Sequence, residues 1–360
     1  MNILFMGTPD FAEESLKKLV EEKFNIVGVV TNPDKPQGRG MKLTKSPVKI
    51  FAEENNLKIY QPEKVRNNEE FLNEIYNLNL DLIIVVAYGK ILPKELLDIP
   101  KYGAINVHGS LLPKYRGAAP IQWAVLNGDK STGITTMFMD EGMDTGDMIL
   151  KKEVEIGENE TTGELWSKLK VVGANLLIAT VKKIDEITSE EEFKKLETIK
   201  IAMFDKSKAR KEMIIEELKK KLGAEKQGED FTIAPMIDKA MAKIDWENKT
   251  VYEIHNLVRG LNPIMGAYSF LGEKKIKFWK TEKIKKENLL EIDKELKEIE
   301  EKIDKLEVGT VILSDQKKGL FIKAKDGIIS ILEIQGENSK RMDIKDFLRG
   351  NEIIAGSLFE

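Results

Sequence analysis

An almost uninterrupted apolar run, DLIIVVAYG at residues 81–89, limits the possible folds of this chain more than any other segment. A central strand of a parallel sheet is covered by helices on both faces, so its sequence is apolar throughout instead of alternating. Similar short runs occur at 2–7, 25–31, 103–109 and 133–140. Helical segments are expected at about 11–22, 47–55 and 161–187. This alternation predicts an α/β domain with an open, mainly parallel sheet and right-handed crossovers.

Length and a change in composition predict a division into three parts. A chain of 360 residues is too long for one ordinary core. We assign residues 1–188 to the sheet domain. Residues 189–230 are rich in Lys and Glu, and we interpret them as a linker with a helical insertion at 209–222. A helix at 251–261 and short alternating strands then predict a small β-barrel domain at 231–360.

One further helix is predicted inside the barrel domain, at 287–307. Its apolar residues recur at alternating spacings of three and four, which is a heptad pattern. They are Leu289, Ile292, Leu296, Ile299, Ile303 and Leu306. Because this stripe spans fewer than three heptads, we interpret it as a surface helix that packs on its own domain. A dimer contact is the alternative.

The composition excludes several classes of chemistry. The chain has no cysteine, so disulfides, thiolate metal sites and cysteine nucleophiles are excluded. Its two histidines, His108 and His255, are too few for a multi-histidine zinc site. The 57 Lys and Arg residues do not outnumber the 61 Asp and Glu residues, so any contact with RNA has to be local. We expect a cytoplasmic protein without a membrane span, because no apolar stretch approaches roughly 18 residues.

Polar side chains follow two neighbouring apolar runs. Asn106 and His108 are two residues apart, so they project to the same side of a strand at its carboxyl end, where open α/β sheets have their sites. Asp144 follows the next run, between Gly142 and Gly146, and we expect these glycines to let the loop fold back towards His108. An amide, an imidazole and a carboxylate are therefore candidates for one active site.

The first turn of the chain does not indicate a dinucleotide cofactor. MGTPDF at 6–11 has one glycine where the dinucleotide fingerprint has three, so we expect no nicotinamide site. We interpret the turn as structural, with Asp10 capping the following helix. The acidic cluster at 140–147 lacks the spacing of a calcium loop, so no metal is expected.

Two motifs carry a resemblance to a known family. NVHGSLLPKYRGAAPIQWA at 106–124 and DEGMDTGDMI at 140–149 resemble the folate-dependent formyltransferases, whose first domain has a Rossmann-like sheet. The resemblance implies that the catalytic residues are Asn106, His108 and Asp144. It also implies a reduced-folate pocket lined by the loop of Ser110, Leu111, Leu112 and Pro113.

The chemistry that this family implies suits the three side chains. Transfer of a formyl group to an amine passes through a tetrahedral intermediate, with negative charge on the formyl oxygen and positive charge on the nitrogen. Asn106 can donate to the oxyanion. His108, when protonated, can stabilise the same oxygen and then pass a proton to the departing folate nitrogen. Asp144 would orient the imidazole, favour its charged form and collect the amine proton through water.

Two other segments resemble the methionyl-tRNA formyltransferases within this family. The Lys-rich loop at 31–49 is broken by Gly and Pro, like the basic insertion loop that reaches the acceptor stem. The tRNA-binding residues implied by this resemblance are Arg39, Lys42 and Lys45. KIDWENKTVYEIHNLVRGLNP at 243–263 resembles their C-terminal extension, an open OB-like β-barrel suited to tracking a nucleic-acid backbone. His255 lies there on an apolar helix, and we assign it a structural role.

The resemblance implies formyl transfer from 10-formyltetrahydrofolate to the amino group of methionyl initiator tRNA, for translation initiation. It implies no metal, and no obligate protein partner is evident. The nearest alternative is an amino-sugar N-formyltransferase, since that branch shares motifs of the segment at 243–263. A non-catalytic RNA-binding protein on the same scaffold is an alternative of another class. The linker insertion and the helix at 287–307 depart from the family pattern.

Overall fold

The structure is a computed structural model that describes residues 1–37, 42–198, 206–284, 303 and 305–360. Two compact units are present, and each contains several segments of the chain. Unit 1 consists of residues 1–120, 132–154 and 166–235, and unit 2 of residues 121–131, 155–165 and 236–360. The domain boundaries expected at 188 and 231 stay predictions.

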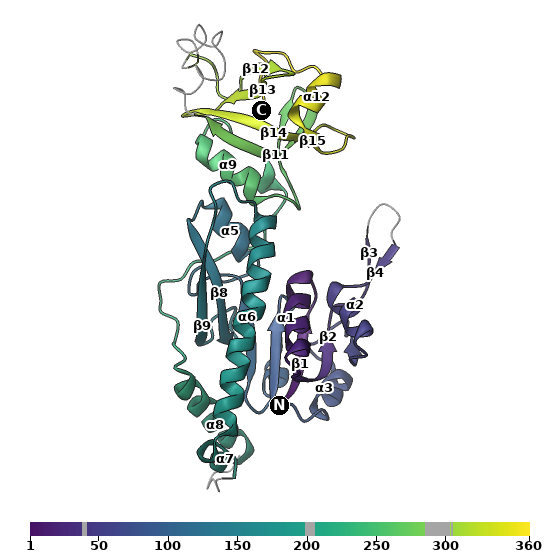
Figure 1. The fold of residues 1–360 in the computed structure, drawn as a ribbon, viewed down its shortest axis with the longest axis vertical. Helices are drawn as coiled ribbons and strands as arrows, with labels where there is room; N and C mark the ends of the chain where they lie inside the picture. The colour runs from purple at the N-terminus through teal and green to yellow at the C-terminus, as the bar shows by residue number, and fades with distance from the viewer. Residues whose placement is uncertain (38–41, 199–205, 285–302, 304) are drawn as a thin grey trace. The chain divides into compact units, whose positions relative to one another are not determined.

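Unit 1 is built on a seven-stranded sheet of order β5-β2-β1-β6-β7-β8-β9 (Figure 1). The first five strands in this order are parallel, and β8 is antiparallel to β7. The strands are β1 Asn2–Gly7, β2 Asn25–Val30, β5 Ile59–Tyr60, β6 Leu82–Val86, β7 Ala104–His108, β8 Ser131–Phe138 and β9 Met148–Glu155. The five apolar runs predicted as strands are β1, β2, β6, β7 and β8. The expected mainly parallel sheet is therefore confirmed.

The strand order determines where a site can form. Going along the chain, the sheet grows from β1 towards β2 and β5, and then continues on the other side of β1 with β6 and β7. Connections therefore leave the carboxyl ends of β1 and β6 in opposite directions, which opens a crevice at that edge of a sheet. β7 is next to β6 and ends at the same edge, at His108.

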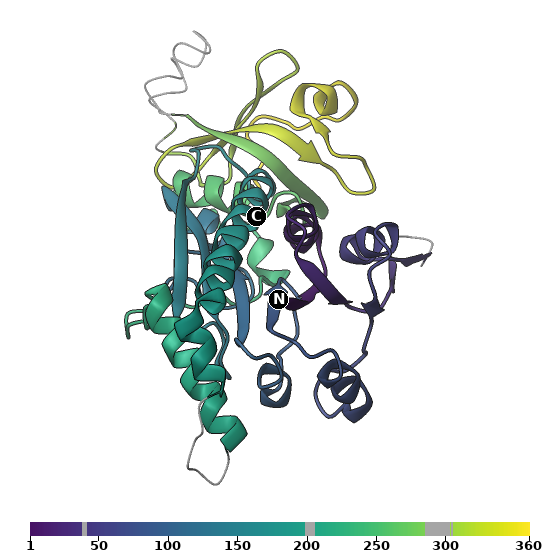
Figure 2. The ribbon, with the colours of Figure 1, turned by 60° about the horizontal axis from the view of Figure 1, so that its bottom comes forward.

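Helices cover both faces of this sheet. α1 (Asp10–Glu21) and α6 (Thr162–Ser189) lie side by side on one face, where the rings of Phe11 and Trp166 meet edge to face at 5.1 Å (Figures 1 and 2). On the other face, α3 (Glu69–Tyr76) buries Phe71 and Ile75 in one cluster with side chains of β1 and β6. Two further helices of unit 1 are α2 Pro47–Glu54 and α4 Lys94–Leu97, whereas α5 Pro120–Leu126 lies almost wholly in unit 2.

The expected helix cap at Asp10 is wrong. The N-cap of α1 is Pro9, and no side chain bonds to the first turn from there. Asp10 is the first helical residue, and its carboxylate accepts hydrogen bonds from Trp166 Nε1 at 3.0 Å and Lys170 Nζ at 3.1 Å. The long-range contact with α6 therefore prevails over the local capping preference.

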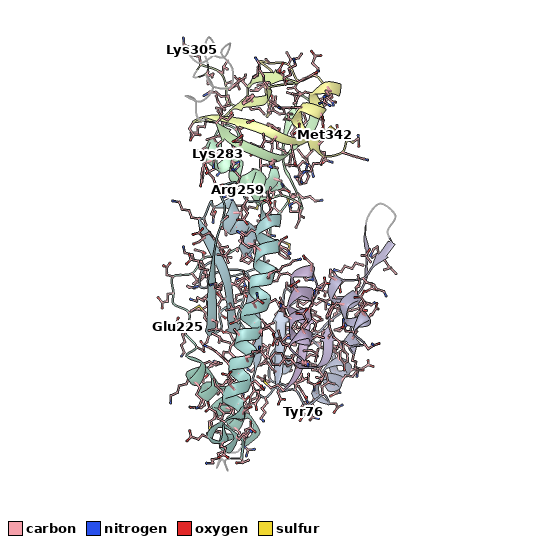
Figure 3. All side chains as sticks on the ribbon, viewed as in Figure 1. Tyr76, Glu225, Arg259, Lys283, Lys305 and Met342 are labelled. Atoms are coloured by element: carbon pink, nitrogen blue, oxygen red, sulfur yellow. The ribbon has the colours of Figure 1, made fainter. Side chains whose placement is uncertain are left out.

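The Lys- and Glu-rich stretch interpreted as a linker is part of unit 1. It contains α7 (Glu191–Thr198) and α8 (Lys206–Leu222), and α8 includes the predicted helix at 209–222. Phe193 of α7 is buried against the ring of Tyr102. After α8, the chain runs back along the sheet domain, and Glu225 forms a two-way backbone bridge with Met148 at 2.8 Å (Figure 3 labels Glu225).

Unit 2 is a helix followed by an antiparallel sheet of order β10-β11-β14-β13-β12, as expected for the C-terminal domain. Its helix α9 (Val251–Gly260) starts with a complete capping box of Thr250 and Glu253. The strands are β10 Ala267–Leu271, β11 Lys274–Ile284, β12 Val311–Asp315, β13 Gly319–Lys323 and β14 Ile328–Gln335, followed by β15 Met342–Asp343 and α12 Ile344–Gly350. Residues near the C-terminus bridge the outer strands, since Phe359 pairs with Leu271 and Leu358 pairs with Thr310. The sheet is thereby closed into a small barrel.

Two earlier segments of the chain are part of unit 2. Leu126 of α5 packs against the barrel core. The Thr162 hydroxyl donates to Gly260 O at 2.8 Å, and Arg259 Nη1 donates to Glu160 O at 3.0 Å and to Gly157 O at 3.3 Å. Helix α9 is therefore held by a loop that lies about a hundred residues earlier in the chain.

Two predicted segments lie partly outside the described residues. In the loop at 31–49, β3 (Lys35–Gln37) and β4 (Lys42–Thr44) form a short antiparallel hairpin, which the sequence did not predict. Of the heptad stripe at 287–307, only Ile303 and Leu306 are described. Both lie in a cluster with Ile312 and Phe321, and the helix at 287–307 stays a prediction. Among the described residues, no helix has the length and apolarity to cross a membrane.

Candidate active site

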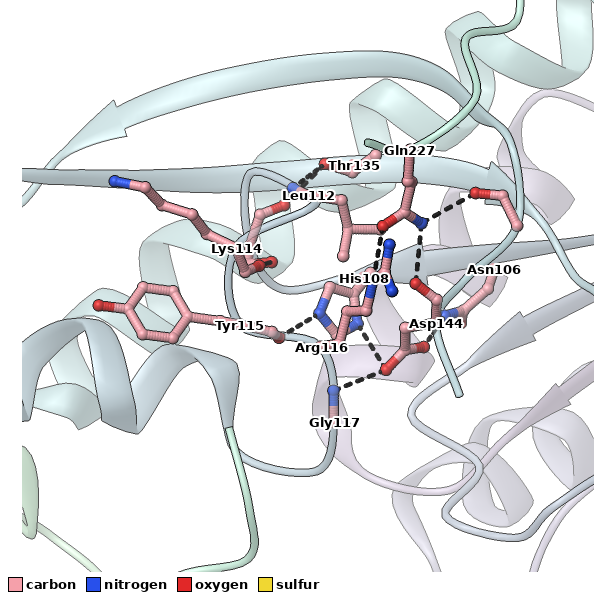
Figure 4. Close-up of polar contacts among 12 residues, drawn as sticks. Asn106, His108, Leu112, Lys114, Tyr115, Arg116, Gly117, Thr135, Asp144 and Gln227 are labelled. Carbon is pink, nitrogen blue, oxygen red and sulfur yellow. Dashed lines mark hydrogen bonds and ion pairs between the residues drawn. The ribbon is translucent and has the colours of Figure 1, made fainter. Parts of the chain in front are cut away.

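Strand β7 and the loop between β8 and β9 bring the three predicted catalytic side chains together (Figure 4). Asn106 Nδ2 lies 3.4 Å from Asp144 Oδ1, and His108 Nδ1 lies 3.6 Å from Asp144 Oδ2. The Asp144 carboxylate also accepts a 2.8 Å hydrogen bond from the backbone N–H of Gly117. The side chains of His108 and Asp144 are 6% and 18% exposed, so their contact is largely shielded from water.

The backbone at Asp144 is unusual. Its φ is 55°, in the left-handed region that few residues other than Gly, Asn and Asp adopt. The glycines on either side were expected to let the loop fold back, and neither has a positive φ. They are required for space instead. A Cβ on Gly146 would lie 1.8 Å from Phe138 O, and one on Gly142 would lie 2.0 Å from Thr145 Oγ1.

The loop after β7 returns to His108. It passes through a cis bond between Leu112 and Pro113, and Tyr115 has a φ of 61°. The carbonyl oxygen of Tyr115 then lies 2.8 Å from His108 Nε2. Because a carbonyl only accepts hydrogen bonds, Nε2 carries the proton in this contact. An imidazolium would donate from both nitrogens, to Tyr115 O and to Asp144 Oδ2.

The four residues predicted to line a folate pocket differ in exposure. Ser110 and Leu112 are buried and hold the loop in place, since Ser110 Oγ donates to Lys114 O at 2.6 Å and Leu112 packs on Met137. Leu111 and Pro113 are partly exposed. Their role in folate binding stays a prediction.

Comparison with known proteins identifies the family. The Formyl transferase profile matches residues 1–181, and the profile of the formyl transferase C-terminal domain matches residues 236–352. The chain belongs to the formyl transferase family.

Individual relatives extend this similarity over the whole chain. This formyl transferase is 45% identical to the methionyl-tRNA formyltransferase of Clostridioides difficile (strain 630), over 99% of both chains. It is 44% identical to the methionyl-tRNA formyltransferase of Caldanaerobacter subterraneus subsp. tengcongensis, over the full length of both. Among solved structures, an N-formyltransferase from Helicobacter canadensis, in complex with folinic acid and dTDP-3-aminofucose, is similar with a TM-score of 0.59. It is 19% identical and covers 93% of this chain and 99% of its own, so this similarity concerns the fold alone.

The residues predicted to bind tRNA are only partly described in this formyl transferase. Arg39 lies outside the described residues. Lys42 is the first residue of β4 and pairs with Gln37 through the backbone. Lys45 Nζ forms an exposed ion pair with Glu53 at 2.6 Å, which raises the pKa of the lysine.

His255, the second histidine, is buried in unit 2. Its Nδ1 lies 3.0 Å from Thr281 Oγ1, and its Nε2 lies 3.3 Å from Glu158 O. Burial, reinforced by the charge of Lys283, lowers the pKa of His255 to about 4.

A cavity of about 210 Å³ is lined in part by His255, Arg259 and Trp279 and includes none of the predicted catalytic residues. Figure 3 shows Arg259 and Lys283 on the neighbouring elements α9 and β11. These contacts agree with a structural role for His255.

Two side chains at the candidate site of this formyl transferase were missed by the sequence analysis. Gln227 Nε2 donates to Asp144 O at 2.8 Å and to Gly146 O at 2.9 Å. Its Oε1 accepts from Arg116 Nε at 2.8 Å (Figure 4). The Arg116 guanidinium also lies over the Phe231 ring, 4.4 Å from its centre. Arg116 belongs to the motif at 106–124, but nothing local distinguishes Gln227. Within the described ranges, no group of three or more His, Asp and Glu side chains could hold a metal ion.

Proposed function

We propose that this chain transfers the formyl group of 10-formyltetrahydrofolate to the amino group of methionyl initiator tRNA. The observation that carries the chemistry is the meeting of Asn106, His108 and Asp144 at the carboxyl end of β7. The identity of the acceptor is supported by the relatives named methionyl-tRNA formyltransferase, which match this chain at 44–45% identity over its full length.

The geometry supports distinct roles for the three side chains. One N–H of the Asn106 amide contacts Asp144, and the second can donate to a formyl oxygen as negative charge develops there. The imidazole of His108 is held between two partners. Its Nδ1 faces the Asp144 carboxylate, and its Nε2 donates to Tyr115 O. For His108 to donate from Nε2 to the formyl oxygen or to the leaving folate nitrogen, this nitrogen has to leave Tyr115 O. We therefore place this exchange of hydrogen-bond partners in the reaction cycle.

The partly exposed apolar residues around this site suit contact with the ring faces of a folate donor. Leu111 and Pro113 offer partly exposed apolar surface, and Ser110 and Leu112 fix the loop that presents it. We propose that this loop lines the folate pocket. The donor supplies an activated formyl group there, and the protein residues bind, orient and exchange protons with it.

We propose that Arg39, Lys42 and Lys45 bind phosphates of the tRNA. Lys42 is a residue of β4, which pairs with β3, and Lys45 directly follows β4. Lys45 is paired with Glu53, so its contribution depends on exchanging that carboxylate for a phosphate. Because phosphate contacts release counterions, Arg39→Ala should weaken tRNA binding and reduce its dependence on salt, while folate affinity is unchanged. An unchanged salt slope in filter binding would exclude Arg39 from the interface.

The test of the function is a formylation assay with 10-formyltetrahydrofolate and purified acceptors. We expect formyl transfer to methionyl initiator tRNA, and a loss of at least about 100-fold in His108→Ala. A nucleotide-linked amino sugar is the competing acceptor, because the similar Helicobacter canadensis structure contains dTDP-3-aminofucose. Preferential formylation of the sugar would support the alternative. Binding of tRNA without any transfer would support a non-catalytic RNA-binding protein.

We also propose that the protein acts in the cytoplasm, where charged tRNA and reduced folate meet, and that it needs no obligate protein partner. A cysteine-free chain needs no oxidising compartment in order to fold. Activity of the purified chain alone would support both points, and a requirement for a cell extract would contradict the second.

A further inference from the structure

The linker that follows α8 is part of the candidate active site. Residues 225–234, here called the linker segment, form backbone bridges with the start of β9 and with the loop after β7. Glu225 pairs with Met148, and Ile233 pairs with Arg116. The N–H of Arg116 donates to Thr232 O at 2.8 Å, and the N–H of Ala234 donates to Arg116 O at 2.7 Å. The linker segment therefore lies against both the loop that carries Asp144 and the loop that returns to His108.

Gln227 lies where these two loops meet. Its amide nitrogen has two N–H groups, and both are used, one by Asp144 O and the other by Gly146 O. Its amide oxygen accepts from Arg116 Nε. Two carbonyls on one side and a guanidinium on the other leave one orientation for this amide. Gln227 thus links the Asp144 turn to Arg116. The next residue, Gly117, donates its backbone N–H to the Asp144 carboxylate.

The Asp144 turn needs such support. Asp144 has a φ of 55°, and a residue in the left-handed region persists only where its surroundings hold it. The direction of the Asp144 carbonyl and that of its Cα–Cβ bond depend on the same backbone angles. A side chain that fixes the carbonyl therefore also fixes the Cα–Cβ bond, from which the carboxylate accepts the Gly117 N–H. Lys219 of α8 also contacts the loop that carries Asp144, through a 2.9 Å ion pair with Asp147.

We propose that Gln227 is a positioning residue that holds the Asp144 carboxylate towards Asn106 and His108. No contact of Gln227 with a substrate is required for this role. The loss of Gln227 should therefore lower kcat and leave both KM values nearly unchanged. The activity part of this inference rests on the proposed function, whereas the geometric part does not.

Two substitutions separate the contacts of Gln227. Gln227→Glu keeps the shape and the Arg116 contact, but an ionised carboxylate cannot donate to Asp144 O or Gly146 O. Gln227→Met keeps the approximate shape and loses all three hydrogen bonds. We expect kcat to fall about 10- to 100-fold in both variants, which is the usual effect of removing a residue that orients a functional side chain. Each KM should stay within about twofold of the wild-type value. The matched control is Asn55→Asp, because the exposed Asn55 amide also donates to a backbone carbonyl, Phe51 O, outside this site.

A second measurement does not depend on activity. The chain has only two histidines, so its imidazole C2–H region should show two resonances, and His255 serves as an internal reference. We expect both Gln227 variants to move the His108 resonance towards its position in Asp144→Asn, at one fixed pH, and to leave the His255 resonance in place. The control Asn55→Asp should move neither.

The outcomes are distinguishable. If kcat in Gln227→Glu stays within about twofold of the wild type, or if the His108 resonance stays in place, the positioning role is refuted. If only Gln227→Met loses activity, the contact with Arg116 matters instead, and the proposed role is again refuted. Should the wild type fail to formylate methionyl-tRNA, the proposed function fails, and the resonance measurement still tests the position of Asp144. A shift of both histidine resonances would indicate general unfolding and would refute a local role.

Discussion

Lowering the pH should weaken unit 2 through His255. This histidine is 2% exposed, and burial lowers its pKa from 6.5 to about 4, with a further contribution from the charge of Lys283. Arg259 acts in the same direction, whereas the backbone hydrogen bond to Glu158 O and the Glu158 charge act in the opposite one. The folded protein therefore binds the proton more weakly than the unfolded chain does.

The sign and size follow from proton linkage. Between about pH 4 and 6.5 the unfolded state carries a proton on His255 that the folded state lacks, so stability rises with pH in this window. On going from about pH 7.5 to pH 5, this one site should reduce the free energy of unfolding of unit 2 by ~2 kcal/mol. Below pH 4 both states are protonated, and the loss from this site levels off.

Two measurements test this linkage. Titration of the His255 C2–H resonance should give a midpoint near 4, and the presence of only one other histidine makes the assignment simple. Hydrogen exchange at β11 and β14 then reports the free energy of opening at both pH values. In His255→Gln, which cannot titrate, the loss should be smaller by ~2 kcal/mol. A midpoint near 6.5, or an equal loss of stability in both proteins, would refute the reasoning.

Three substitutions test the roles proposed for Asp144, Gly146 and Thr250. Asp144→Asn should lower kcat at least about 100-fold with folate binding intact, because the carboxylate charge is removed without a change of shape; steady-state formylation and a folate-binding titration measure the two effects. Gly146→Ala places a Cβ 1.8 Å from Phe138 O and should destabilise unit 1 by about 1–3 kcal/mol, measured by urea unfolding. Thr250→Ala removes the capping box with Glu253 and should cost unit 2 about 1 kcal/mol; a change below the error of chemical denaturation would contradict the role of this cap.

Sequence patterns predicted most of the sheet because its strands are buried on both faces. β6 is buried at every residue, and its sequence is accordingly apolar throughout. β9 was missed because it is half-exposed and reads MILKKEVE, with charged residues over most of its length. The β3–β4 hairpin was missed because Pro36 and the glycines nearby favour a loop in any local analysis.

Part of the candidate site was predictable from the spacing of residues along one strand. Asn106 and His108 lie on one strand, so their spacing alone brings them to one side. The approach of Asp144 depends on a left-handed backbone at Asp144 itself, which no spacing reveals. Gln227 could not be found from the sequence, because it contacts Asp144 across 83 positions and lies in a stretch that resembles a solvated linker. Pairing over such distances depends on how the chain packs and not on local preference.

The discontinuous make-up of unit 2 limits how freely it can be moved between proteins. A fragment starting at residue 236 lacks the carbonyls of Gly157 and Glu160, and the Arg259 guanidinium, 4% exposed in the native chain, would lose these acceptors. The same fragment lacks the Thr162 hydroxyl that donates to the end of α9. A chimera made by joining two parents at the linker therefore exchanges the barrel without the loops that hold its helix. Successful transplantation requires residues 121–131 and 155–165 from the same parent as the barrel.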